Sequence, residues 1–177
     1  MASKITIPDL KKIRVTDPLF SHYAGMVAKK MIPVQWEILN GKQGQSRCFC
    51  IDNFRIAGGT LQGEHRGVVF GDTDAYKWLE AVAYCANNGE TEYIPEADEL
   101  IEIIGQAQQP DGYLDTYFIA AEPEHKWQNL TDCHEMYCAG HMTEAGVAYY
   151  QATGKTKLLD ICCKLCDHID RRFGREA

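Results

Sequence analysis

The sequence has no cluster of lysine and arginine, and its formal net charge is −7. Proteins bind nucleic-acid backbones through clustered positive charge, so the composition argues against a nucleic-acid partner. It does not exclude a neutral ligand such as a sugar. The chain also lacks an apolar run of the roughly 18 residues that would cross a bilayer. No membrane partner is therefore expected.

The first twenty residues lack the apolar core of a signal peptide. A cytoplasmic location is the resulting expectation, and in that reducing compartment the eight cysteines should be free thiols. Their spacing lacks the paired Cys-x-x-Cys units of a structural zinc module. Cys162, Cys163 and Cys166 do lie close together. The pattern around them is strongly helical, which favours small buried residues over metal ligands.

What the sequence does contain is a helical pattern along nearly its whole length. Asp17 followed by Pro18 is typical of a helix start. Pro33 should kink or split this first helix, which ends near residue 40. Four further helices are expected, at about 74–88, 95–109, 132–153 and 157–173. The stretch 41–71 is too long for a plain connector and predicts a structured or functional loop.

An internal repeat aligns residues 83–104 with residues 148–169 without gaps. Gly89 and Gly154 mark the same helix end in the two copies. A unit of two helices joined by a glycine turn is thus repeated, although chance similarity between two amphipathic hairpins is an alternative. Such units bury their apolar faces by stacking on neighbours. We therefore expect part of a ring of helical hairpins, which this chain is too short to close.

The segment CHEMYCAGH (133–141) holds two cysteines, two histidines and a glutamate. It is not the zinc-protease motif His-Glu-x-x-His, because position 138 is cysteine. At helical spacing, His134, Cys138 and His141 could ligate a metal, but the segment shows no carboxylate on that face. A structural histidine and a histidine that lines a ligand pocket are the other two interpretations.

Two tryptophans and two aspartates have simpler interpretations. Trp36 and Trp78 could stack on a sugar, but both sit at helical spacing among apolar residues, which predicts core positions. Asp72 and Asp74 precede a helical run and are predicted to be N-capping carboxylates rather than catalytic ones.

Four segments resemble, in order and spacing, the N-terminal part of glycoside hydrolase family 127, the β-L-arabinofuranosidase type. They are IPVQWEILN (32–40), FGDTDAYKWLEA (70–81), AQQPDGYLDTYF (107–118) and HEMYCAGHMTEAGVAYYQATG (134–154). The resemblance spans about residues 5–175. It implies an all-α fold, a partial (α/α)6 barrel, in which residues 1–177 form an N-terminal fragment of the catalytic domain.

The resemblance also implies an activity, retaining hydrolysis of non-reducing-end β-L-arabinofuranosides or related sugars. The family's nucleophile is a cysteine bound to zinc, and a separate glutamate is the acid/base. None of the eight cysteines here matches those positions, so zinc, its ligands and the catalytic residues are expected outside this chain. The substrate-binding candidates are His134 and, as lesser ones, His141, Gln45 and Asp74.

The expected partner is a small carbohydrate, and the full-length protein could form a homodimer. The alternative function is a non-catalytic helical module that binds a carbohydrate or a protein partner.

Overall fold

The computed structural model describes residues 8–42 and 48–175. Within these residues the regular structure is helical and contains no strand, which confirms the predicted all-α class. The helices are α1 (Pro18–Met26), α2 (Ile32–Leu39), α3 (Cys50–Ala57), α4 (Asp72–Asn87), α5 (Ile94–Ala107), α6 (Thr116–Ala120), α7 (Leu130–Cys133), α8 (Glu135–Thr153) and α9 (Lys157–Phe173). Short 3-10 turns η1 (Leu10–Lys12) and η3 (Pro123–His125) and a π-helical stretch η2 (Val27–Met31) complete them. No helix in this part of the chain is long and apolar enough to cross a membrane.

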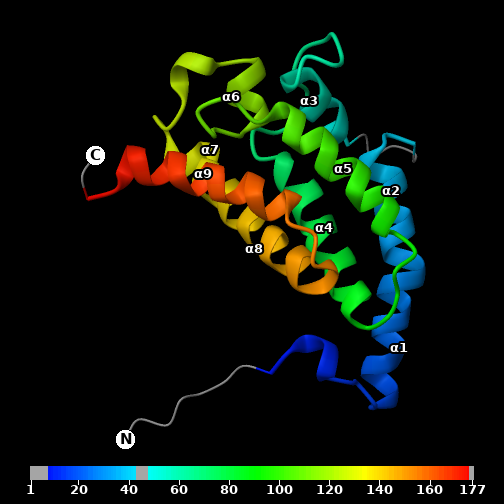
Figure 1. The fold of residues 1–177 in the computed structure, drawn as a ribbon. Coiled ribbons are helices and arrows are strands. Elements are labelled where there is room, and N and C mark those ends of the chain that lie inside the picture. Colours follow the sequence, from blue (N-terminus) through cyan, green and yellow to red (C-terminus); the bar gives the residue numbers. More distant parts are fainter. Residues whose placement is uncertain (1–7, 43–47, 176–177) are drawn as a thin grey trace, which may run out of the picture.

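Two helical hairpins form the centre of the molecule, α4 with α5 and α8 with α9 (Figure 1). Gly89 and Gly154 end the first helix of each hairpin with φ values of 93° and 76°. Glycine adopts this left-handed conformation without steric cost, which is why it ends helices so often. The structure therefore has the repeated unit that the sequence alignment predicts.

The second helices of the two hairpins, α5 and α9, run in the same direction. Lys155, just before α9, forms an ion pair with Asp98 in the early part of α5. Further along both helices, the side-chain amide of Gln108 donates to the carbonyl oxygen of Ile161 at 2.9 Å. Because the contacting residues advance together along the two helices, α5 and α9 are parallel neighbours.

The first helices, α4 and α8, are parallel too and pack along each other more extensively than any other pair. Lys77 in α4 donates to the Tyr137 hydroxyl in α8 at 2.8 Å, and about one turn further on Glu80 lies beside His141. Two parallel layers of this kind are the arrangement of part of a helical-hairpin barrel. The expected fold class is confirmed.

The first helix is split as Pro33 predicts, but the chain does not turn there. A π-helical stretch, η2, joins α1 to α2 just before the proline, and the flanking residues keep right-handed helical backbone. A wider π turn accommodates a residue that has no N–H and whose ring would clash with a regular turn. Trp36 of α2 stacks on Trp78 with ring centroids 4.7 Å apart, and the indole of Trp78 donates to the Ile32 carbonyl. The predicted core role is confirmed for Trp78, which is buried, whereas Trp36 is partly buried and packs against the core.

The segment 41–71 is structured in its described part, as its length predicts, and it contains the unpredicted helix α3. Ile51 and Phe54 of α3 are fully buried. The side chain of Asn53 holds the returning chain by two hydrogen bonds with the backbone of Arg66, at 2.8 and 3.1 Å. Residues 43–47 lie outside the described residues.

Candidate functional site

The candidate site lies where α4 and α8 begin, and its central residue is His134. We predicted one helix across 132–153, but the structure has two, α7 and α8, separated by His134. His134 has φ 59° and ψ 25°, a left-handed backbone. Its carbonyl then accepts the first hydrogen bond of α8, from the Cys138 N–H at 2.9 Å. His134 is therefore the N-cap residue of α8 and does not lie on the side of a longer helix.

The imidazole of His134 belongs to a row of rings at the start of α8. Phe70 meets it edge to face with centroids 5.1 Å apart, and Tyr137 meets it on another side at 5.9 Å. Tyr137 in turn contacts His141 at 4.5 Å. The ammonium of Lys77 fixes the Tyr137 hydroxyl by a hydrogen bond. The structure therefore brings two predicted residues, His134 and His141, together through an aromatic ring that the prediction left out.

Asp74 lies in the first turn of α4, three residues before Lys77, and is exposed. The Cys48 thiol donates to its carboxylate across 3.9 Å. Both residues line a cavity of about 400 Å³ whose wall also includes Lys77 and Trp78. Lys77 thus links this cavity to the row of rings. The fourth candidate, Gln45, lies outside the described residues.

Neither Asp72 nor Asp74 is the N-cap that we predicted, because Gly71 occupies that position and no side chain caps α4. Asp72 has a different role. Its carboxylate is buried and accepts hydrogen bonds from the Thr116 N–H at 2.8 Å and the Thr116 hydroxyl at 2.5 Å. Burial raises the pKa of Asp72 to about 6, against the lowering effect of these bonds. Asp115, which caps α6, is buried nearby, and burial followed by repulsion from Asp72 raises the pKa of its carboxyl as well. Asp72 thus joins α4 to α6, whereas Asp115 caps α6 itself, and both carboxylates are buried away from a substrate.

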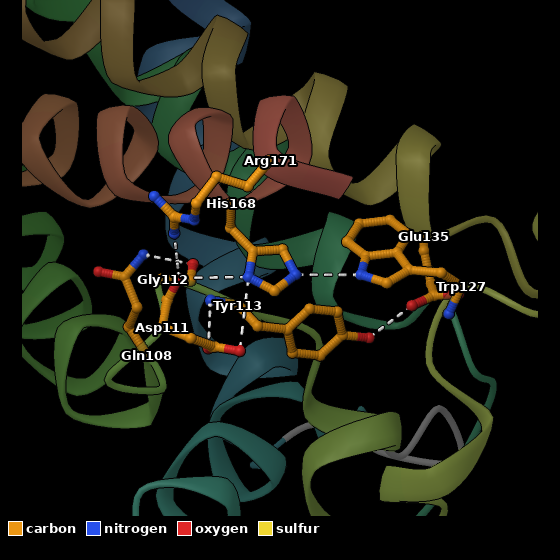
Figure 2. Close-up of polar contacts among 8 residues, drawn as sticks. All are labelled: Gln108, Asp111, Gly112, Tyr113, Trp127, Glu135, His168 and Arg171. Carbon is orange, nitrogen blue, oxygen red and sulfur yellow. Dashed lines mark hydrogen bonds and ion pairs between the residues drawn. The ribbon is translucent and has the colours of Figure 1, made fainter. Parts of the chain in front are cut away.

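Glu135, the second residue of the HEMY motif, binds the PDGY motif of residues 110–113 (Figure 2). Its carboxylate accepts from the Tyr113 hydroxyl at 2.5 Å and from the Trp127 N–H at 2.7 Å. The indole of Trp127 donates to Nε2 of His168 in α9 at 3.1 Å. Sequence reasoning missed Glu135, although the joint occurrence of the two motifs was a signal that they interact.

The triad His134, Cys138 and His141 does not form a metal site. Cys138 is buried, and burial raises the pKa of its thiol, which disfavours the thiolate that binds metals. Within residues 8–42 and 48–175, the group that could hold an ion is His141 with Glu80 and Glu144, whose ligand atoms lie within 4.8 Å of one another. The expectation that no carboxylate lies on this face was therefore wrong, because Glu80 comes from α4.

Cys162, Cys163 and Cys166 differ in burial because they lie on different faces of α9. Cys162 is buried and its thiol donates to the Met142 carbonyl at 3.2 Å, as expected for a small core residue. Cys163 and Cys166 are exposed, contrary to that expectation. The one candidate metal group among the described residues contains no cysteine. The described cysteines therefore do not fit a zinc ion held by cysteine.

Residues 12–177 match the family model described as the beta-L-arabinofuranosidase, GH127 catalytic domain. A curated relative from Bifidobacterium longum subsp. longum, the non-reducing end beta-L-arabinofuranosidase, is 35% identical over 182 residues, which cover 93% of this chain and 28% of the relative. The crystal structure of a GH127 beta-L-arabinofuranosidase from Geobacillus stearothermophilus T6 is 49% identical and superposes with a TM-score of 0.85, over 92% of this chain and 26% of that one.

A second solved structure, of a GH127 beta-arabinofuranosidase, gives a TM-score of 0.80 at 29% identity, again over 92% of this chain and 26% of the other. The chain therefore spans about a quarter of the length of the relatives it matches. Because the family model covers nearly all of its residues, the chain belongs to the GH127 beta-L-arabinofuranosidase catalytic-domain family.

Proposed function

We propose that the chain forms the N-terminal part of a glycosidase that removes non-reducing-end β-L-arabinofuranosyl units, or related sugars, with retention of configuration. The observation that carries this proposal is the family match over residues 12–177, within which His134 stands partly exposed at the mouth of α8. The names of the relatives support the sugar class.

The chain's own contribution is substrate binding. A neutral imidazole offers one donor and one acceptor, which suits a sugar hydroxyl, so His134 would bind a hydroxyl of the arabinofuranosyl ring. The hydrogen bond from Lys77 holds Tyr137 beside it. His141 lines a groove along α8 with Tyr137, and Asp74 lines the cavity beside α4, so these two would extend the binding surface around His134. Gln45 stays a predicted sugar contact.

Retention requires two reacting groups on opposite faces of the sugar. In this proposal the nucleophile is a cysteine thiolate held by zinc, and both it and the acid/base glutamate lie outside these 177 residues. Zinc would lower the pKa of the thiol so that the thiolate is present. The described residues of this chain do not fit that centre, and their role in the proposal is confined to binding.

Titration of the protein with methyl β-L-arabinofuranoside, followed by NMR, tests the binding role. His134→Ala should weaken binding roughly tenfold, since the loss of one or two hydrogen bonds costs about 1.4 kcal/mol. His22→Ala is the matched control, because this histidine is exposed and lies in α1. Helix α1 lines a groove beside the C-terminal half of α4, whereas His134 lies where α4 and α8 begin. Unchanged affinity in the His134 variant would contradict the assignment.

A hydrolysis assay separates the enzyme from the alternative. Release of L-arabinose by a protein that contains the whole matched domain, with NMR detection of the β-anomer as first product, supports the glycosidase. Saturable binding by that same protein without hydrolysis would instead support the non-catalytic carbohydrate-binding module. Absence of both would overturn the proposal.

A further inference from the structure

Among the described residues, two that are not glycine have a left-handed backbone. They are Trp127, with φ 63°, and His134, with φ 59°. In this conformation the Cβ of an L-residue is crowded by the neighbouring carbonyl oxygen. Such residues persist only where the surrounding structure over-determines them, and they concentrate at functional sites.

Both residues are linked to Glu135, Trp127 through the carboxylate and His134 through the backbone. Oε2 of Glu135 accepts the backbone N–H of Trp127 at 2.7 Å, and His134 precedes Glu135 directly in the chain. The side chain of Glu135 is buried, and burial raises the pKa of its carboxyl. Glu135 therefore holds Trp127 by a hydrogen bond to its side chain and is joined to His134 by the peptide bond of its backbone.

The other oxygen of Glu135 is anchored to a rigid part of the fold (Figure 2). Oε1 accepts the hydroxyl of Tyr113, whose ring is fully buried. Gly112 lets this turn lie directly on α9, since a Cβ there would collide with the Lys164 carbonyl oxygen. Asp111 accepts hydrogen bonds at its carbonyl from Arg171, at 2.7 Å, and from Nδ1 of His168, at 3.2 Å. Glu135 is thus connected through Tyr113 and its turn to helix α9.

We propose that Glu135 is the positioning residue of His134: it fixes the left-handed turn that presents the His134 imidazole between Phe70 and Tyr137. The inference rests on the proposed function, in which His134 binds the sugar. Glu135 itself does not touch the sugar, because its carboxylate is buried and both of its oxygens are taken by donors from the protein. Its effect is transmitted through one peptide unit.

The first test follows the His134 ring resonances by NMR in three variants. Glu135→Met has a similar length and accepts neither hydrogen bond, so it should shift the resonances away from their position beside the Phe70 and Tyr137 rings. Glu135→Gln should restore them, because its amide oxygen can accept from Trp127 and its amide group can donate to the Tyr113 oxygen. Tyr113→Phe removes one hydrogen bond only and should give a smaller shift, which keeps the test usable if Glu135→Met folds poorly.

The second test is a double-mutant cycle on the unfolding equilibrium constant with His134→Gly. Glycine adopts the left-handed backbone without strain. In the wild type, relaxation of the strained His134 offsets part of the loss, so Glu135→Met should lower stability more in the His134→Gly background than in the wild type. Equal losses in both backgrounds, or an unmoved His134 resonance in Glu135→Met, would overturn the proposal, since Glu135 would then be a general stabiliser.

Sugar binding distinguishes this inference from the function on which it rests. Glu135→Met should weaken binding of methyl β-L-arabinofuranoside about as much as His134→Ala, and the double variant should be no weaker than either. If the wild type binds no arabinofuranoside although the resonances and the cycle behave as expected, the positioning role stands and the proposed sugar function fails.

Discussion

At the scale of single residues, Asp72 makes stability depend on pH. Its pKa in the folded protein, about 6, lies above the ordinary value of 3.8 because the carboxyl is buried. A raised pKa means that the folded state binds the proton more tightly than the unfolded state does. The protonated Asp72 carboxyl therefore stabilises the folded state fully below pH about 4. This stabilisation, about 3 kcal/mol in total, is lost as the pH rises through 6.

Asp72→Asn should flatten this dependence. The amide oxygen can still accept the Thr116 N–H, and the amide group can donate to the Thr116 hydroxyl, so the contacts survive without a titrating group. Urea unfolding at pH 5, 6, 7 and 8 measures the effect, with the exposed Asp74→Asn as the control. A wild-type slope that persists in Asp72→Asn would show that another buried acid, such as Asp115, is responsible.

The residue scale is also where the sequence was least informative. The position of Asp72 at the start of a helical run does not indicate that its carboxylate binds Thr116, which is 44 positions away. The left-handed backbone of His134 depends on Tyr113 and Trp127, which reach Glu135 from elsewhere in the chain. Periodicity over 132–153 therefore predicted an unbroken helix. Local patterns carry no information on such contacts.

At the scale of helices, the approach of α8 to α9 depends on Gly146. A Cβ at this position would collide with Sγ of Cys162. Gly146→Ala should therefore destabilise the protein by about 1–3 kcal/mol, the usual cost of overpacking a core. Thermal or urea unfolding measures the change, and Cys162→Ala in the same chain should recover much of it.

Gly140 of the same helix is the matched control, because a Cβ there would meet nothing within 4 Å. Replacement of an exposed helical glycine by alanine normally adds about 0.5–1 kcal/mol. Gly140→Ala should therefore stabilise the protein while Gly146→Ala destabilises it. Two changes of the same sign would disprove the close-packing explanation.

The contact between Trp127 and α9 depends on His168. Because the indole donates to Nε2 of His168, this nitrogen is the acceptor, and Nδ1, which faces the Asp111 carbonyl, is the donor. Asp111 Oδ2 also lies 3.5 Å from Nδ1. Removal of the imidazole should therefore release the indole N–H.

The Trp127 indole N–H resonance should therefore shift and exchange faster with solvent in His168→Leu, which removes the acceptor. The Trp78 indole, which donates to the Ile32 carbonyl, serves as the internal control. His168→Asn supplies another acceptor and should give a smaller change. Identical behaviour of the two indoles in His168→Leu would contradict this assignment.

At the scale of the whole molecule, the repeat was the most informative feature of the sequence. Helix ends at Gly89 and Gly154 and the apolar periods on both sides are local properties, so the two hairpins and their order could be predicted. Helix α3 was missed because it is short and flanked by glycines, and its helical state depends on burial of Ile51 and Phe54. The homodimer and the cytoplasmic location stay predictions, for sedimentation analysis and cell fractionation to test.

The parallel course of α4 and α8 separates the two ends of the molecule into different tasks. The short glycine turns that close both hairpins lie at one end, whereas the described part of the first long connection, 48–71, meets the second, 108–134, at the other end beside His134. Changes in the long connections would therefore act on the residues around His134, while the short turns keep the hairpins in register.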